Sequence, residues 1–254
     1  MSLDLCRVVL VETHYAGNLG ATARVMRNMA LRDLVLVRPI ASPLETQALQ
    51  MSAHGEPILR SARVAARFDD AVGDCVLVVG TSARSGGLFR RQSVGPPDAI
   101  LPHVVEALRQ RRPAALVFGP EPTGLDNDTV TRCHHLIRIP TGEEYSALNL
   151  AQAVAICLHE LRKTWDACGP AIEPSLLLAT FAEEEQMFGQ LQKALEEIHF
   201  LYGEKAEPLM HALRHMLGRA RLSVMEVKVL LGLARQIRWY VAHHPTKMSE
   251  SKHP

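Results

Sequence analysis

The stretch Phe118–Leu125 reads FGPEPTGL and follows the apolar, β-branched run Ala114–Val117. A segment of helical character comes after it, so the stretch joins a strand to a helix. Two other segments occupy the same kind of junction: Asn18–Arg24, which reads NLGATAR, and Ile139–Asn149, which reads IPTGEEYSALN. In an open α/β sheet such junctions meet at the carboxyl ends of the strands, where ligands bind. We therefore expect one binding site drawn from these three places.

The apolar runs around these junctions predict a parallel sheet. Each run is short and nearly free of polar residues, which is typical of strands buried on both faces. Helical segments alternate with them, at about residues 18–29, 97–111, 126–132 and 148–165, and this alternation favours a doubly wound α/β fold. The predicted strands are Cys6–Val11, Asp33–Val37, Val76–Thr81, Ala114–Gly119 and His135–Ile139.

The alternation of strands and helices stops near Cys168-Gly169-Pro170. From Pro174 the apolar residues recur only at helical spacing, and Ser223 with Glu226 forms a capping box that opens the last of three helices. We therefore expect two domains, an α/β domain over residues 1–169 and a small all-α domain over residues 170–254.

Two segments between the predicted strands are irregular. Residues 43–67 suit a short helix and an edge strand. Residues 82–97 contain Arg84, Arg90 and Arg91 and are too long and too basic for a simple turn, so we expect a mobile surface loop there.

The 254-residue chain has the composition of an ordinary globular protein, with 47% hydrophobic and 22% charged residues. Its net charge of +1 gives no general field for nucleic acid, so a surface that binds nucleic acid has to be local. The five cysteines have no metal-like spacing and suit buried, reduced thiols in a cytoplasmic protein. No apolar run approaches the roughly 20 residues that span a membrane, and no N-terminal apolar stretch follows a basic region.

The side chains of the first junction suit an anionic ligand. Asn18 is a good N-cap for the helix that follows it. Arg24, Arg27 and Asn28 stand at i, i+3 and i+4, on one face of that helix. A helix start preceded by small residues favours phosphate or a developing alkoxide beside Arg24. The alternative is a pair of exposed, solvated arginines, which is commoner on an arbitrary helix.

The second junction carries a carboxylate in a glycine-containing loop. Gly119 and Gly124 bracket Glu121 and permit close approach of the backbone to a ligand. Glu121 is placed either to hold its own loop or to hold Arg24. A solvent-facing loop carboxylate is the simpler alternative.

The third junction combines apolar and polar groups. Ile139 and Leu148 supply apolar walls and backbone groups for an adenine ring. Ser146 and Asn149 add polar contacts. Ser146 also suits the N-cap of the long helix that follows, and capping is compatible with binding.

In this order the three junctions closely resemble the three motifs of the SpoU–TrmD (SPOUT) RNA methyltransferases, TrmH class, over roughly residues 4–166. The resemblance implies a parallel-sheet domain with a deep trefoil knot, a chain path that most folds avoid. It implies that S-adenosylmethionine binds in the knot and that no metal ion is needed. The implied cofactor contacts are Thr81, Ser82, Ala83, Gly119, Glu121, Ile139, Ser146 and Leu148.

The same resemblance implies methyl transfer to the 2′-hydroxyl of an RNA ribose. Asn18 and Arg24 are then the residues that bind and activate the ribose. The implied catalytic set is Arg24, Asn18, Glu121, Ser146 and Asn149, and the implied RNA contacts are Arg24, Arg27, Arg84, Arg90 and Arg91.

The segment Ala220–Ser223, followed by Glu226, resembles the helical extension of the TrmJ branch of this class. That resemblance implies a cytoplasmic homodimer that methylates the ribose of nucleotide 32 in the tRNA anticodon loop, with residues 170–254 binding the tRNA. The chain departs from the family pattern at Ala16, where a proline is usual, and at Ala30, where a glycine is usual. Prolines also flank Glu121.

Two other functions are compatible with the sequence. The first is a 2′-O-methyltransferase of the same class that acts on another tRNA position or on ribosomal RNA, and the TrmJ-like extension argues against ribosomal RNA. The second is a non-catalytic RNA-binding module on the same scaffold, and the intact motif residues argue against it.

Overall fold

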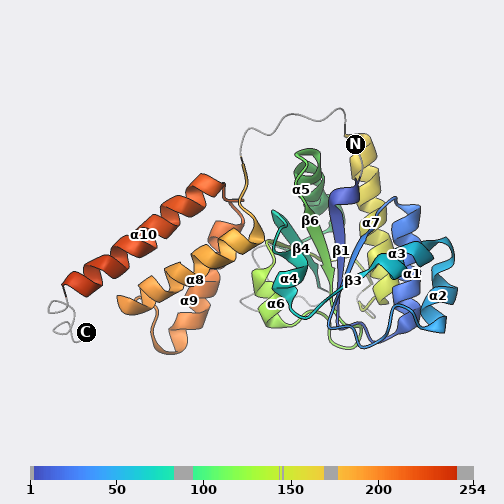
Figure 1. Ribbon diagram of the computed structural model, residues 1–254, viewed down its shortest axis with the longest axis horizontal. Coiled ribbons are helices and arrows are strands. Elements are labelled where there is room, and N and C mark those ends of the chain that lie inside the picture. The colour runs from blue at the N-terminus through green and yellow to red at the C-terminus, as the bar shows by residue number, and fades with distance from the viewer. Residues whose placement is uncertain (1–2, 83–93, 143, 145, 169–176, 245–254) are drawn as a thin grey trace. The chain divides into compact units, whose positions relative to one another are not determined.

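The computed structural model describes residues 3–82, 94–142, 144, 146–168 and 177–244 (Figure 1). The chain divides into two compact units, Met1–Ser175 and Leu176–Pro254. The expected domain boundary at residues 169/170 lies outside the described residues.

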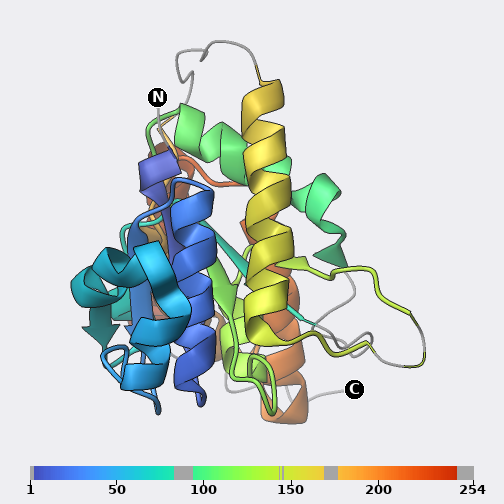
Figure 2. The same cartoon turned by 90° about the vertical axis from the view of Figure 1, so that its right-hand side faces the viewer.

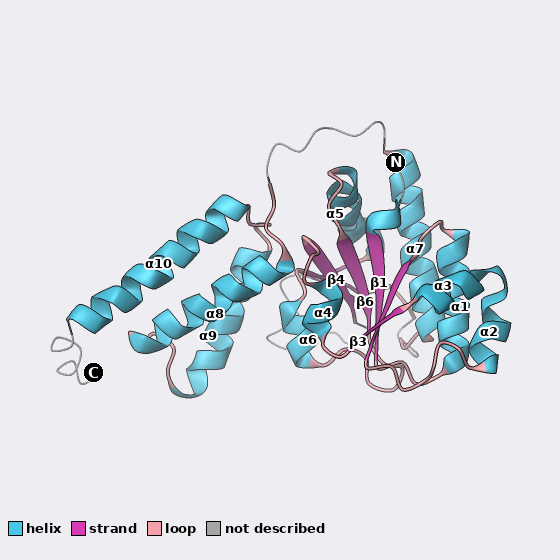
Figure 3. Cartoon of the chain, in the orientation of Figure 1, coloured by secondary structure: helices cyan, strands magenta, loops and turns pink. Residues whose placement is uncertain are grey.

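The first unit is built on a parallel sheet with helices on both faces (Figure 3). Its strands follow the order β3-β2-β1-β6-β4-β7-β5 across the sheet. They are β1 (Cys6–Val11), β2 (Asp33–Val37), β3 (Arg63–Ala65), β4 (Leu77–Thr81), β5 (Val94–Gly95), β6 (Ala114–Phe118) and β7 (His135–Ile137).

The sheet confirms the predicted α/β class and the five predicted strands. β1 and β2 have the predicted bounds, β4 begins one residue later, and β6 and β7 end slightly earlier. β1 and β6 are buried along their whole length, which explains their continuous apolar sequence. β3 is the edge strand expected within residues 43–67. β5 corrects the prediction of a loop throughout residues 82–97, of which residues 83–93 lie outside the described part of the chain.

The order of the strands explains why distant junctions meet. β1 and β6 are neighbours in the sheet, with Leu10 paired to Phe118. The chain leaves β1 toward β2 on one side and leaves β6 toward β7 on the other. The loops after β1 and β6 therefore open a crevice at the carboxyl edge of the sheet, at the switch point where α/β proteins bind ligands.

The helices of the first unit form two layers around the sheet. On one face α7 packs against α1 and α5, and Figure 2 shows α7 in yellow beside α1 in blue. On the other face lie α4 and α6 (Figure 1). The helices are α1 (Ala16–Asn28), α2 (Thr46–Ser52), α3 (Glu56–Ser61), α4 (Phe68–Val72), α5 (Pro97–Arg109), α6 (Asn127–Arg132) and α7 (Leu150–Ala167), and the short turn η2 (Ala53–Gly55) lies between α2 and α3.

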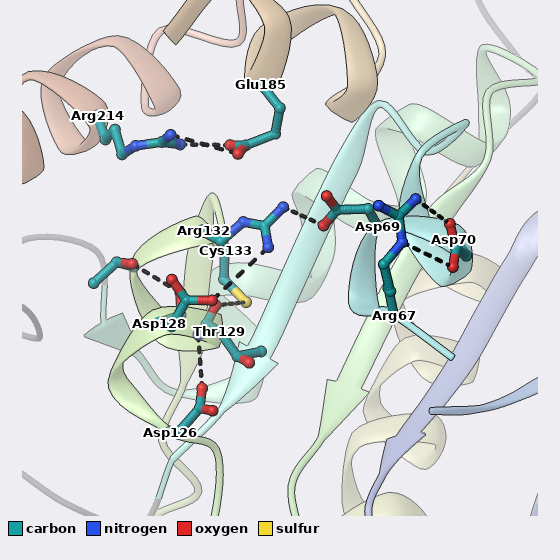
Figure 4. A network of polar contacts seen from close by, with 11 residues as sticks. Arg67, Asp69, Asp70, Asp126, Asp128, Thr129, Arg132, Cys133, Glu185 and Arg214 are labelled. Atoms are coloured by element: carbon teal, nitrogen blue, oxygen red, sulfur yellow. Dashed lines mark hydrogen bonds and ion pairs between the residues drawn. The ribbon is translucent and has the colours of Figure 1, made fainter. Parts of the chain in front are cut away.

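Polar contacts fix the face that carries α4 and α6 (Figure 4). Arg132 of α6 forms an ion pair with Asp69 of α4, and its guanidinium lies 5.5 Å from the centre of the Phe68 ring. Asp126 caps α6 by accepting a hydrogen bond from the backbone N–H of Thr129 at 2.8 Å. These contacts stabilise the start of the segment that leads into the third junction.

The second unit is helical, as expected. It contains α8 (Phe181–Glu197), the turn η3 (Gly203–Lys205), α9 (Ala206–Gly218) and α10 (Val224–His243). The capping box of Ser223 and Glu226 is confirmed, and Thr180 with Glu183 forms a second one at α8. The core of the unit includes Met187, Phe188, Leu191, Met210 and Val227.

Candidate active site

A cavity of about 750 Å³ opens beside the second and third junctions. Its volume lies within the range of roughly 300–1,000 Å³ that is typical of ligand pockets. Seven of the eight predicted cofactor contacts line this cavity, which brings together residues from three separate parts of the chain. They are Thr81, Ser82, Gly119, Glu121, Ile139, Ser146 and Leu148. The eighth, Ala83, lies outside the described residues.

The walls of the cavity are set by close packing of backbone. A Cβ added to Gly119 would lie 2.2 Å from the backbone nitrogen of Leu125, so only glycine fits where the loop folds back on itself. Gly124 adopts a φ of +68°, and a Cβ placed on it would meet nothing within 4 Å. Its backbone therefore faces open space, where a ligand can approach closely.

The cavity combines apolar walls with a few polar groups. Leu125, Ile137 and Leu150 join the predicted Ile139 and Leu148 on the apolar side. The polar residues of the lining include Thr141, Ser146 and Glu121. A flat aromatic ring with a polar, charged tail matches this division, and S-adenosylmethionine has that chemistry.

Glu121 joins the second junction to the first. Its Oε1 accepts a hydrogen bond from Nδ2 of Asn18 at 2.7 Å. Its Oε2 accepts one from the backbone N–H of His14 at 3.0 Å. Because the loop after β1 is held in this way, Glu121 anchors that loop. Among the described residues it forms no hydrogen bond or ion pair with Arg24. The contact with His14 was not foreseen, since a backbone donor leaves no signal in the sequence.

Asn18 joins the first junction to the third. Its Oδ1 accepts a hydrogen bond from Nδ2 of Asn149 at 3.0 Å. The two amides and the Glu121 carboxylate therefore form a continuous chain of hydrogen bonds across all three junctions. This geometry confirms that the junctions meet in one place, as the fold class predicts.

Two predicted helix caps are wrong. α1 begins at Ala16 with Tyr15 at the N-cap position, so Asn18 lies within the helix. Its side chain forms hydrogen bonds with Glu121 and Asn149 in the other two junctions and does not cap the N–H groups of its own helix. α7 is capped by Asn149, whose Oδ1 accepts from the Ala151 N–H at 2.9 Å, and not by Ser146.

Arg24 does not lie at a helix start. It is the ninth residue of α1, about 12 Å along the axis from the first, so the anion site expected from a helix N-terminus does not apply to it. It stands about 120° around the helix from Asn18 and is exposed. Among the described residues Arg24 has no hydrogen bond or ion pair, and it does not line the cavity.

The other predicted RNA contacts are placed only in part. Arg27 is exposed on α1, three residues after Arg24, as the spacing predicts. Arg84, Arg90 and Arg91 lie outside the described residues. Within the described part of the chain, no group of three or more acidic, His or Cys side chains is placed to hold a metal ion.

The cysteine near the cavity is not a nucleophile. Cys133 lies against Gly80, where an added Cβ would be 2.9 Å from its Sγ. Burial raises the pKa of the Cys133 thiol to about 12, and the same cause raises the pKa of Cys157 to about 12. Both thiols therefore stay protonated near neutral pH and act as core side chains.

The sequence over the whole sheet and site matches one known family. The model of the SpoU rRNA Methylase family matches residues 6–159. The chain belongs to the SpoU methylase family. A second model, described as tRNA methyltransferase TrmJ, C-terminal domain, matches residues 182–250. This SpoU methylase therefore carries the TrmJ-type extension in its second unit.

Curated relatives of this SpoU methylase span nearly its whole length. The tRNA (cytidine/uridine-2′-O-)-methyltransferase TrmJ of Salmonella choleraesuis (strain SC-B67) is 36% identical over 239 residues, which cover 92% of this chain and 97% of that protein. The protein of the same name from Citrobacter koseri is 37% identical over 239 residues, with the same coverage of both chains.

Solved structures agree with this assignment. The crystal structure of TrmJ from Z. mobilis ZM4 superposes with a TM-score of 0.77 at 29% identity, covering 91% of this chain and 98% of that one. A probable methylase family protein from Haemophilus influenzae Rd KW20 superposes with a TM-score of 0.61 at 32% identity, covering 95% and 99%. The described helices contain none long and apolar enough to cross a membrane.

Proposed function

We propose that this SpoU methylase transfers a methyl group from S-adenosylmethionine to the ribose 2′-hydroxyl of nucleotide 32 in the tRNA anticodon loop. The observation that carries the proposal is the cavity beside the Glu121–Asn18–Asn149 hydrogen-bond chain, in a protein whose relatives are named tRNA (cytidine/uridine-2′-O-)-methyltransferases. The free cysteines, four of them buried, fit a reducing cytoplasm, where we place the enzyme.

The cavity residues would bind and orient the cofactor. Ile139 and Leu148 would hold the adenine, and Thr81, Ser82 and Ser146 would supply polar contacts to the rest of the molecule. When bound, S-adenosylmethionine supplies an electrophilic methyl group on a sulfonium that leaves readily. No metal ion is needed for that chemistry.

The polar chain beside the cavity would position the ribose. Asn18 is held at both ends of its amide, by Glu121 and by Asn149, so its orientation is fixed before the substrate arrives. One amide hydrogen and one lone pair of Asn18 remain for the ribose hydroxyls. Glu121 therefore acts mainly by holding Asn18 and the loop at His14 in place.

Arg24 would bind the neighbouring phosphate and stabilise the emerging alkoxide. An arginine is essentially always protonated in proteins, so it does not serve as a general base. Its role would be electrostatic, like that of other groups preorganised for developing negative charge. The proton would leave through the RNA phosphate or through water.

We infer a homodimer with shared sites from the position of Arg24. The residue does not line the cavity of its own chain, and it has no hydrogen bond or ion pair among the described residues. A second copy that presents Arg24 to this cavity would complete the site. The apolar sequence of α7 is weaker evidence for a dimer, because much of its apolar surface is covered within one chain. Its buried side chains include Val154, Cys157, Leu158 and Leu161.

The second unit would grip the body of the tRNA through a local patch. Of the arginines in this unit, Arg219 and Arg235 are exposed, and Arg238 is exposed but paired with Glu197. Arg214 is half-buried against Glu185 and the Phe188 ring, and Arg221 is also half-buried.

The role of the second unit is tested by a chain that ends at Cys168. This shortened protein should bind S-adenosylmethionine but lose most of its tRNA affinity and methylation. If it methylates tRNA as well as the full chain does, the second unit is not the substrate-binding element.

The function is tested by incubating the full-length protein with unmodified tRNA and S-adenosylmethionine and then mapping the modified nucleotide. We expect a 2′-O-methyl group at nucleotide 32. A methyl group at another tRNA position would correct the site of action, and methylation of ribosomal RNA alone would overturn the assignment to tRNA.

A further inference from the structure

A second concave surface of the first unit lies outside the cavity described above. It is an open hollow of about 760 Å³ between α1, η2 and α3. Its lining carries two arginines, a histidine and one glutamate among apolar and small residues. The lining residues are Arg27, Ala53, His54, Glu56, Pro57, Arg60 and Ser61.

The floor of the hollow is held in place by backbone contact. A Cβ added to Gly55 would lie 2.6 Å from the backbone C and O of Ala23, so the η2 turn rests directly on α1. Ala53 adopts a φ of +46°, a conformation that costs a non-glycine residue free energy. The turn therefore presents His54 beside the helix that carries Arg27 in a fixed arrangement.

The hollow carries a positive charge that no described acidic residue neutralises. Arg27 and His54 are both exposed and have no hydrogen bond or ion pair with a described residue. Arg60 is paired with Glu56, with its Nη2 2.6 Å from Oε1, so these two charges offset each other. The side chain left to attract an anion is Arg27, with the imidazole of His54 as a hydrogen-bond donor nearby.

The hollow continues the surface on which Arg24 stands. Arg24 and Arg27 are three residues apart on α1 and therefore share one side of the helix. We propose that the hollow between α1, η2 and α3 binds a phosphodiester of the tRNA strand next to the methylated nucleotide, with Arg27 and His54 as its contacts. This inference rests on the proposed function and adds a place for the strand beyond the target ribose.

The test compares tRNA binding by Arg27→Gln, His54→Ala and Arg27→Lys at several salt concentrations in the full-length protein. A lost phosphate contact weakens binding and lowers the slope of log affinity against log salt by about 0.7. We expect Arg27→Gln to weaken binding about five- to tenfold at low salt and to lower the slope by about that amount. Arg27→Lys should keep most of the affinity because a phosphate accepts a point charge.

Arg32→Gln is the matched control. Arg32 follows α1, where the chain turns into the amino end of β2, is 73% exposed and has only a 4.0 Å contact with Asp4, so the substitution removes the same charge outside the hollow. Equal binding and equal salt slopes for Arg27→Gln and Arg32→Gln would overturn the inference, as would a loss of affinity in Arg27→Lys as large as in Arg27→Gln.

Steady-state methylation separates this inference from the proposed function. Arg27→Gln should raise KM for tRNA more than it lowers kcat, since Arg27 contacts the strand and not the reacting ribose. A wild-type protein that binds tRNA but transfers no methyl group would contradict the proposed function, while the binding comparison would still decide whether the hollow holds phosphate.

Discussion

At the scale of single residues, the sequence was enough to predict which residue types form the site and roughly where in the fold they come together. It was not enough to predict the local role of each residue. Asn18 and Ser146 both look like helix caps, because Asn and Ser favour that position. In the structure Asn18 bonds to Glu121 and Asn149, more than 100 positions away in the chain. Such long-range bonds leave no local pattern. The family resemblance grouped the three residues in one site, but it did not give the bonds between them.

The cofactor slot is tested by Leu148→Arg. Leu148 is partly buried in the wall of the cavity, and a guanidinium there would fill the slot with charge. We expect calorimetric titration to show no binding of S-adenosylmethionine by this variant. Unchanged affinity would remove the basis for the adenine slot. Ile156→Arg on the exposed face of α7 is a control that should bind normally.

The role of Arg24 is tested by Arg24→Ala. Loss of a preorganised group that stabilises a developing oxyanion typically costs on the order of 100-fold in turnover, and we expect that or more. Cofactor affinity should stay nearly normal, because Arg24 does not line the cavity. Arg24→Lys should restore little activity, since lysine lacks the planar fork of arginine. Near-normal turnover by Arg24→Ala would contradict the electrostatic role.

At the scale of helices and strands, the end of α1 contains an unfavourable backbone conformation at Ala30. The sequence indicates it only through the alanine that stands where the family usually has glycine. The N–H of Leu31 donates to the carbonyl of Met26 at 2.9 Å, and the N–H of Ala30 donates to Arg27 at 3.3 Å, which is a Schellman motif. Ala30 has a φ of +61°, where glycine is favoured. This explains why a glycine is usual at this position in the resembling family.

Ala30→Gly should therefore stabilise the protein. Relief of the left-handed alanine is worth about 1 kcal/mol, and we expect a gain of that order in the free energy of unfolding measured with urea. Ala21→Gly within the same helix is the control and should destabilise by about 0.5–1 kcal/mol. A loss of stability in Ala30→Gly would contradict the assigned backbone conformation.

At the scale of the whole molecule, the alternation of strands and helices was enough to predict the fold class and the helical second unit. The edge strand β5 was missed because two residues carry no periodic pattern. The trefoil knot stays a prediction of the resemblance. So does the dimer, which the position of Arg24 supports.

Mixing two inactive variants tests the shared site. A heterodimer of Arg24→Ala and Leu148→Arg contains one cavity with both an intact wall and an intact Arg24, provided that Arg24 comes from the partner. We expect methylation to return when the two proteins are unfolded together and refolded as a mixture. Refolding each variant alone is the control and should leave it inactive. No recovery in a mixture proven to contain heterodimers would place Arg24 in the site of its own chain.

We propose that the three distant junctions act as one catalytic site, and a double-mutant cycle on methyl transfer to tRNA tests whether they do. Glu121→Ala removes the acceptor of Asn18, and Asn149→Ser removes the donor to Asn18 while keeping a good cap for α7. If the residues act as a unit through Asn18, each single variant should lose on the order of 100-fold in kcat/KM, and the double variant should lose little more than the worse single one. Losses that multiply to about 10,000-fold would show that the junctions act independently and that Glu121 and Asn149 do not act through Asn18.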